Sequence, residues 1–197
     1  MFPYFLDALG LTFTQVAIWS SIAALTALAT TVLWGRLADR VGNKGVLAIS
    51  TFLAGLLLPA AWIAAGMTGQ VGWIWISAVF DAAAWGAIGP AIFNLALVSA
   101  PRANRVVFIA MYSLGTGISG FVGGALSGPL LVGLRAFEFP AFGATWTAYH
   151  SLFAISGVLR MFAWLWLRSV PEAEAWRTRD LLRSMRTGWK GMGFPWR

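Results

Sequence analysis

The sequence lacks cysteine and contains few charged residues. It has no cysteine and one histidine, and only 11% of its 197 residues are charged. The absence of cysteine excludes disulfide bonds and thiolate-bound metals, and one histidine alone cannot form a metal site. An ordinary soluble domain carries about 25% charged residues. We therefore expect no metal, no other cofactor and no water-soluble fold.

Long hydrophobic runs make up much of the chain. Hydrophobic residues make up 59% of the chain, more than a small soluble domain can cover with polar surface. Asp81 is the only charged residue between Gly45 and Pro101. A bilayer is crossed by about 20 apolar residues in a helix, which satisfies its own backbone hydrogen bonds. The sequence predicts an all-α membrane protein with about five transmembrane helices, near residues 15–35, 46–66, 73–98, 107–133 and 148–167.

The connections between these runs alternate between basic and neutral. The loop after the first run holds Arg36, Arg40 and Lys44, whereas the next loop is uncharged. Arg102 and Arg105 follow, and then a loop in which one acidic residue balances one basic residue. The positive-inside rule assigns the basic loops and the chain end to the cytoplasm, in the plasma or inner membrane of the cell. Topology thus explains the net charge of +7, and we expect no nucleic-acid partner.

This reading divides the chain into three parts. Residues 1–14 would be the outer end of a preceding span with an outer loop, residues 15–168 a five-helix transmembrane bundle, and residues 169–197 a cytoplasmic basic tail. Apolar residues recur among the arginines of the tail between Glu172 and Trp189. This pattern suits either a short helix on the anionic inner leaflet or a solvated segment.

The loop after the first span has a distinctive sequence. It reads Gly-Arg-Leu-Ala-Asp-Arg-Val-Gly-Asn-Lys from position 35 to position 44. A glycine at position 42 allows a tight turn, and Asp39 can accept hydrogen bonds from helix amides or pair with an arginine. Such a hairpin can be formed or broken as a conformational latch, and its candidate residues are Gly35, Leu37, Asp39, Arg40, Gly42 and Lys44.

This segment resembles the signature loop of the major facilitator superfamily, Gly-x-Leu-Ala-Asp-Arg-x-Gly-Arg-Lys. Asn43 replaces one basic residue of that pattern. The family has twelve spans in two six-helix halves, and the loop follows the second span of either half. The resemblance implies a partial six-helix half. We assign it to the C-terminal half, with the end of span seven and spans eight to twelve, because the arginine that the first half usually carries in its fourth span is missing from residues 73–98.

A glycine-rich pattern in the fourth run resembles a second motif of the family, Gly-x8-Gly-x3-Gly-Pro-x2-Gly-Gly. In the family this motif is associated with proton-coupled antiporters. Val132 departs from it. Small residues let helix backbones approach closely, so helix packing is the alternative explanation. The candidate packing residues are Gly115, Gly124, Gly128, Pro129 and Gly133.

A few polar residues lie within the expected spans. Ionised groups in a bilayer face the bundle interior or water. Counted from the outer side at 1.5 Å per residue, Asp81 lies about 12 Å deep and Arg160 about 18 Å deep. One hypothesis is that Asp81 faces a central cavity as a proton-binding or substrate-binding carboxylate and can pair with Arg160. The alternative is that Asp81 is a hydrogen-bonded residue of the bundle and that Arg160 snorkels or fixes helix packing. Asn94 is a further cavity candidate or an interhelical hydrogen-bonding group, and His150 is expected to be solvated. Tryptophans near span ends, Trp62 and Trp146 among them, are expected in the headgroup layer.

Two functions follow from these features. The first is a secondary, proton-coupled transporter of a small solute that works by alternating access in the bilayer. This chain would then be partial, with the missing N-terminal half supplied by the same gene or by a separate chain. The alternative is a non-transporting membrane subunit or scaffold that associates through glycine-rich helix faces. An enzyme is not expected, because Asp81 stands alone in its span and no cluster of carboxylates could hold a metal-bound pyrophosphate.

Overall fold

The computed structural model describes residues 1–141, 143–167 and 169–170. Five of its helices are long and apolar enough to cross a membrane. Their bounds are Phe13–Val41 (α1), Asn43–Thr68 (α2), Gly72–Ser99 (α3), Arg105–Leu134 (α4) and Ala148–Leu167 (α5). The expectation of an all-α membrane fold with five long helices is therefore confirmed. The expected basic tail lies almost entirely outside the described residues.

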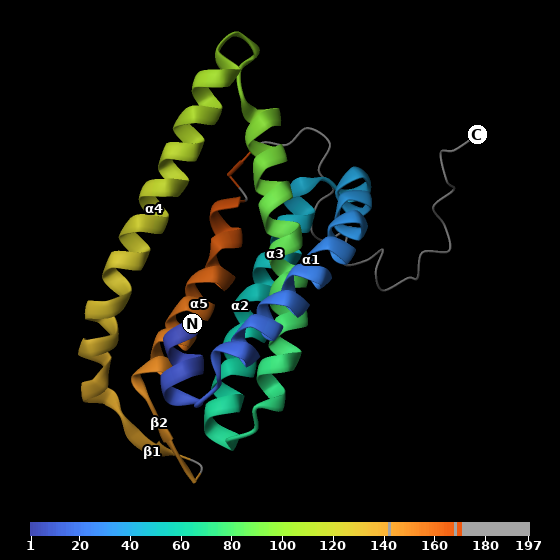
Figure 1. Ribbon diagram of the computed structural model, residues 1–197. Helices are drawn as coiled ribbons and strands as arrows, with labels where there is room; N and C mark the ends of the chain where they lie inside the picture. The colour runs from blue at the N-terminus through green and yellow to red at the C-terminus, as the bar shows by residue number, and fades with distance from the viewer. Residues whose placement is uncertain (142, 168, 171–197) are drawn as a thin grey trace.

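Short elements connect these helices or precede them. A π-helix, η1, spans Tyr4–Ala8, and 3-10 turns, η2 and η3, occupy Arg102–Asn104 and Arg135–Phe137. An antiparallel hairpin joins α4 to α5, with β1 at Phe139–Ala141 and β2 at Ala144–Trp146. The hairpin lies at the same end as the α2–α3 turn (Figure 1). The charge pattern assigns this end to the outside, and it is termed the outer end below.

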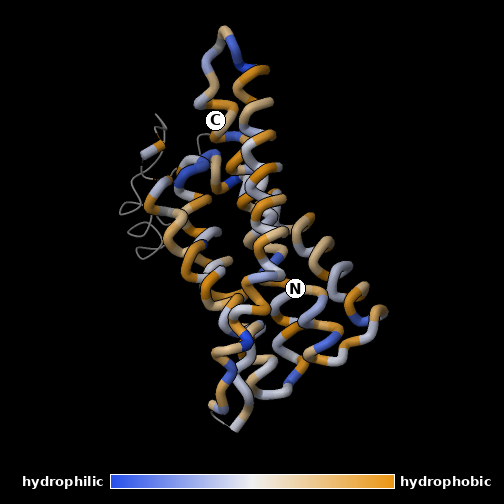
Figure 2. Tube along the Cα trace, turned by 90° about the vertical axis from the view of Figure 1, so that its left-hand side faces the viewer, coloured by the Kyte–Doolittle hydropathy of each residue, from blue (hydrophilic) through white to orange (hydrophobic). Residues whose placement is uncertain are grey.

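Helix α2 is the centre of the bundle. It packs against α3 on one side and α5 on another, and α1 packs against α3. The core holds residues of α2 and α3 together with Tyr4 and Phe5 of η1, which are 1% and 0% exposed. Most of the length of the helices is hydrophobic (Figure 2). The outward-facing apolar side chains are those that lipid tails would cover.

Helix α4 stands apart from the rest of the bundle. Figure 1 shows it along one side of the molecule, beside α5. None of its residues is buried, although it is the longest of the five helices at 30 residues. Most of its apolar surface is exposed within the described part of the chain.

Candidate functional site

A cavity of about 830 Å³ lies between α3, α4 and α5. Asp81 comes from α3 and Arg160 comes from α5, and both line this cavity. The structure thus brings together the two charged residues that the depth estimate had paired. The described lining consists of Met1, Trp62, Asp81, Trp85, Gly123, Leu126, Ser127, Leu130, Leu152, Phe153, Ile155, Ser156, Leu159, Arg160 and Ala163.

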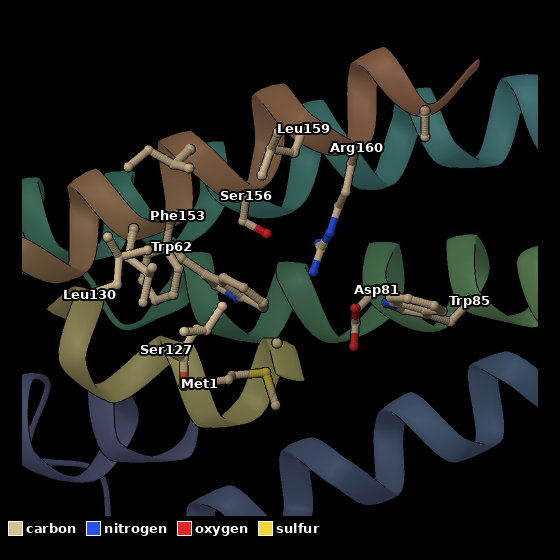
Figure 3. A pocket seen from close by; sticks show the side chains of 15 residues that line it. Met1, Trp62, Asp81, Trp85, Ser127, Leu130, Phe153, Ser156, Leu159 and Arg160 are labelled. Atoms are coloured by element: carbon tan, nitrogen blue, oxygen red, sulfur yellow. The ribbon is translucent and has the colours of Figure 1, made fainter. Parts of the chain in front are cut away.

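Asp81, Trp85 and Arg160 form the polar part of the cavity. Arg160 projects from α5 toward α3, and its Cζ atom lies 5.7 Å from the centroid of the Trp85 ring, within the range of a cation–π contact. Asp81 and Arg160 thus place one negative and one positive side chain in the same cavity. The indole nitrogen of Trp85 points toward the Asp81 carboxylate (Figure 3). One helical turn separates Asp81 from Trp85, so both lie on the same face of α3.

The other part of the cavity is apolar and aromatic. Trp62 from α2 and Phe153 from α5 are in ring contact, with centroids 5.0 Å apart. Ser156 lies one turn before Arg160 on α5, and its hydroxyl faces the cavity (Figure 3). An apolar pocket with a small number of polar groups at one end is the usual form of a small-molecule site.

The expected headgroup position of Trp62 is wrong. Trp62 is only 7% exposed, and its indole N–H donates a 3.0 Å hydrogen bond to the Ser77 hydroxyl. Its distance from the span end in sequence indicated an interfacial residue. The packing of α2 between α3 and α5 buries it instead.

The expected solvation of His150 is also wrong. His150 is 2% exposed and lies against Tyr4, with 3.4 Å between its Nε2 atom and the Tyr4 hydroxyl. Its Nδ1 atom accepts a 3.1 Å hydrogen bond from the Thr147 amide. The π-helix η1 folds over this region and covers the imidazole, a contact between residues far apart in sequence.

Asn94 does not join Asp81 and Arg160. It is exposed and lines a separate cavity of about 80 Å³ together with Trp34, Gly35 and Asn43. Among the described residues its side chain makes no hydrogen bond. Asn94 thus lies beside the loop between α1 and α2, toward the opposite end of the bundle from the hairpin.

The loop between α1 and α2 joins three helices. Gly42, with φ of 84°, ends α1 and directly precedes α2, a backbone conformation that favours glycine. Lys44 donates a 2.8 Å hydrogen bond to the carbonyl of Val170, just after α5. Leu37 packs against the core. Asp39 is exposed, and in the described part of the chain it forms no hydrogen bond.

The glycine pattern of α4 makes no close helix contact within this chain. A Cβ atom added at Gly115, Gly124, Gly128 or Gly133 would meet nothing within 4 Å. The close approach occurs between α2 and α5 instead, at Gly55 and Gly157. Sequence reasoning missed this pair, because neither glycine has another glycine three or four residues away in its helix.

The family model of the Major Facilitator Superfamily matches residues 1–195, nearly the whole chain. No curated protein matches the sequence, and no solved structure matches it.

Proposed function

Because this chain belongs to the Major Facilitator Superfamily of membrane transporters, we propose that it moves a small solute by alternating access through the cavity between α3, α4 and α5. The observation that supports this proposal is the placement of Asp81 and Arg160 in one cavity between helices that are long and apolar enough to cross a membrane. Ionised side chains within a bilayer are costly, and such residues commonly belong to substrate or proton pathways. Asp81 is the proposed proton-binding or substrate-binding carboxylate, and transport is secondary, without ATP.

The loop between α1 and α2 would act as a latch in this cycle. Its lysine joins the start of α2 to the chain after α5, so the helices can be tied together at the cytoplasmic side. Alternating access requires such ties to form in one state and break in the other. Asn94, which lies beside the loop, would belong to this latch.

A second set of helices would complete the path. The chain corresponds to the C-terminal half of a family member, and the exposed α4 would pack against helices of the N-terminal half. Its glycines would then serve close packing across that contact. An immunoblot of source membranes with an antibody against this chain tests the proposal. A band near twice 21.2 kDa supports one long chain, whereas a band near 21.2 kDa requires a separate partner chain.

The absence of cysteine provides a direct test of alternating access. Within these 197 residues each introduced thiol is unique, since the sequence has no cysteine. Any cysteine elsewhere in the native gene would first be replaced by serine. We would express the native gene with Ser156→Cys or Ser127→Cys, which replace cavity-lining residues. Membrane vesicles of both orientations would then be treated with a membrane-impermeant thiol reagent. Gln70→Cys, in the α2–α3 turn, is the control and should react from the outer face alone.

The outcomes separate the two functions. Labelling of the cavity thiols from both membrane faces supports alternating access, because a cavity open to each side in turn admits the reagent from each. Labelling from one face, or from neither, contradicts it. Labelling from one face or from neither would favour the alternative, a non-transporting subunit that associates through the exposed α4.

A further inference from the structure

The cavity contains one acidic and one basic side chain, and their formal charges cancel. Asp81 and Arg160 are the charged side chains of its described lining. Met1 also lines the cavity. A ligand that pairs with one of the two side chains leaves the charge of the other unbalanced in the cavity, and this abandoned charge lies between the membrane-spanning helices.

Few other titratable groups face this pair. Among the helices that pack against α3, α1 has no charged side chain before Arg36, and α2 has none after Lys44. α4 contributes Tyr112, which lines a different cavity, between α3 and α4. α5 contributes His150, which is buried at the outer end against Tyr4. No nearby side chain of the described residues could therefore neutralise an abandoned charge.

The two partners differ in how they can relieve that charge. An abandoned carboxylate becomes neutral by taking up one proton, whereas a guanidinium does not lose its proton in proteins. A cation bound at Asp81 would leave Arg160 charged and unpaired, which is strongly unfavourable in a low-dielectric site. An anion bound at Arg160 leaves Asp81, which can be protonated. The site is therefore asymmetric and favours anions.

From this asymmetry we infer that the cavity takes a small organic anion with an apolar body together with one proton. This inference rests on the proposed transport function and specifies its substrate class and coupling. The anion pairs with the guanidinium of Arg160, and one proton from solvent binds the Asp81 carboxylate. An O–H bond forms on Asp81, no bond in the solute breaks, and the charge of the occupied site equals that of the empty site. Anion and proton then cross together, as in a symporter.

The surroundings of Arg160 define the rest of the ligand. Ser156 offers a hydroxyl one turn away on the same face of α5. Trp62 and Phe153 offer aromatic surfaces on the side away from Asp81, as Figure 3 shows. A carboxylate attached to a ring or short hydrocarbon body matches this arrangement, because the charged end meets Arg160 and the body meets the aromatic rings.

Protection of the Ser156→Cys thiol tests this inference with defined probes. Benzoate supplies the carboxylate with a ring, and benzylamine and benzyl alcohol supply a cation and a neutral molecule of similar shape. We expect benzoate to slow labelling of Ser156→Cys, and the other two probes to slow it at least tenfold less at equal concentration. Benzoate remains an anion at pH 6 and above, since carboxylic acids titrate near pH 4.

The pH dependence of protection measures the coupled proton. If one proton must bind with each anion, the benzoate concentration for half protection rises about tenfold for each pH unit between pH 6 and pH 8. In Asp81→Asn the protection should persist and lose this dependence, because the amide needs no proton. Arg160→Gln should lose protection while the thiol still reacts. Glu138→Gln, a carboxylate variant outside this cavity, should behave like the parent.

Three outcomes of these experiments would overturn the inference. Stronger protection by benzylamine than by benzoate, absence of protection by benzoate, or pH dependence that persists in Asp81→Asn would each do so. The last result would place the proton on another group. If one of these results is found but the thiol is still labelled from both membrane faces, the substrate inference is wrong and the proposal of alternating access is still supported. Labelling of the unliganded protein from one face alone instead overturns the transport proposal itself.

Discussion

Gly55 of α2 and Gly157 of α5 approach each other so closely that a Cβ atom on Gly157 would lie 2.6 Å from the Gly55 carbonyl oxygen. The reverse is nearly as close, with 2.9 Å between a Cβ atom on Gly55 and the Gly157 carbonyl oxygen. The ring of Pro59 borders the same contact. α2 is the centre of the bundle, and α5 provides Arg160, so this contact helps to place the cavity.

Gly157→Ala should destabilise the protein. The added methyl group must push α5 away from α2, and overpacking of this kind typically costs about 1–3 kcal/mol. Thermal unfolding of the protein in detergent would show a lower Tm. Gly124→Ala, in α4, is the matched control and should leave Tm nearly unchanged, because its Cβ atom would meet nothing within 4 Å. Equal Tm values for the two variants would show that the α2–α5 contact is not tight.

Tyr4→Phe should loosen the N-terminal π-helix from the bundle. The Tyr4 hydroxyl donates a 2.8 Å hydrogen bond to the Trp62 carbonyl, and both groups are buried. Loss of one buried hydrogen bond costs about 1 kcal/mol. Limited proteolysis after residue 8 would become faster, and the Tm would fall slightly. Tyr112→Phe, which removes a hydroxyl without a hydrogen-bond partner in the described residues, should change neither property. Identical proteolysis of both variants would contradict the role of this bond.

Gly66→Ala should clash with two buried side chains at the outer end. A Cβ atom on Gly66 would meet both the Nε2 atom of His150 and the Tyr4 hydroxyl. The expected result is a lower Tm, as for other overpacked sites. A double-mutant cycle gives the sharper measurement. Gly66→Ala should cost less in a His150→Ala background, because the smaller side chain leaves room for the methyl group. Additive effects would mean that the two positions do not touch.

Lys44→Met should change the balance between the two access states. The variant removes the hydrogen bond from the Lys44 ammonium to the Val170 carbonyl and keeps much of the side-chain length. If this hydrogen bond exists in one access state only, its removal destabilises that state by about 1–2 kcal/mol and shifts the equilibrium between the two states several-fold. The ratio of Ser156→Cys labelling from the two membrane faces would report this shift. Arg105→Gln, at the start of α4, is the control. An unchanged ratio in Lys44→Met would exclude a latch at this position.

Local sequence was sufficient for the helices and for the family. Each span depends on a run of apolar residues with almost no charge, and hydropathy along the chain reveals such a run directly. The family model matches residues 1–195, in agreement with the resemblance that the loop at positions 35–44 carries. The similar depths of Asp81 and Arg160, which line one cavity, could also be estimated, because depth in a bilayer follows from helical rise alone.

Contacts between helices could not be predicted from the sequence in the same way. The sequence gives the depth of a residue but not the direction in which its helix faces, so Asn94 could not be separated from Asp81. His150 lies near a span end, and only the fold of η1 over it accounts for its burial. The glycines that bring helices together here include Gly55 and Gly157, which belong to no glycine pattern, whereas a Cβ atom on the patterned glycines of α4 would meet nothing within 4 Å.

The sequence by itself determined that this protein lies in a membrane, how many long helices it forms and to which family it belongs. The reason is that a bilayer selects helices by the transfer free energy of consecutive residues, which is a local property. The tertiary structure alone decided which faces meet, that the cavity lies between α3, α4 and α5, and that α4 stays exposed. These features depend on side-chain packing between segments that can lie more than a hundred residues apart in the sequence. No local sequence pattern specifies this packing.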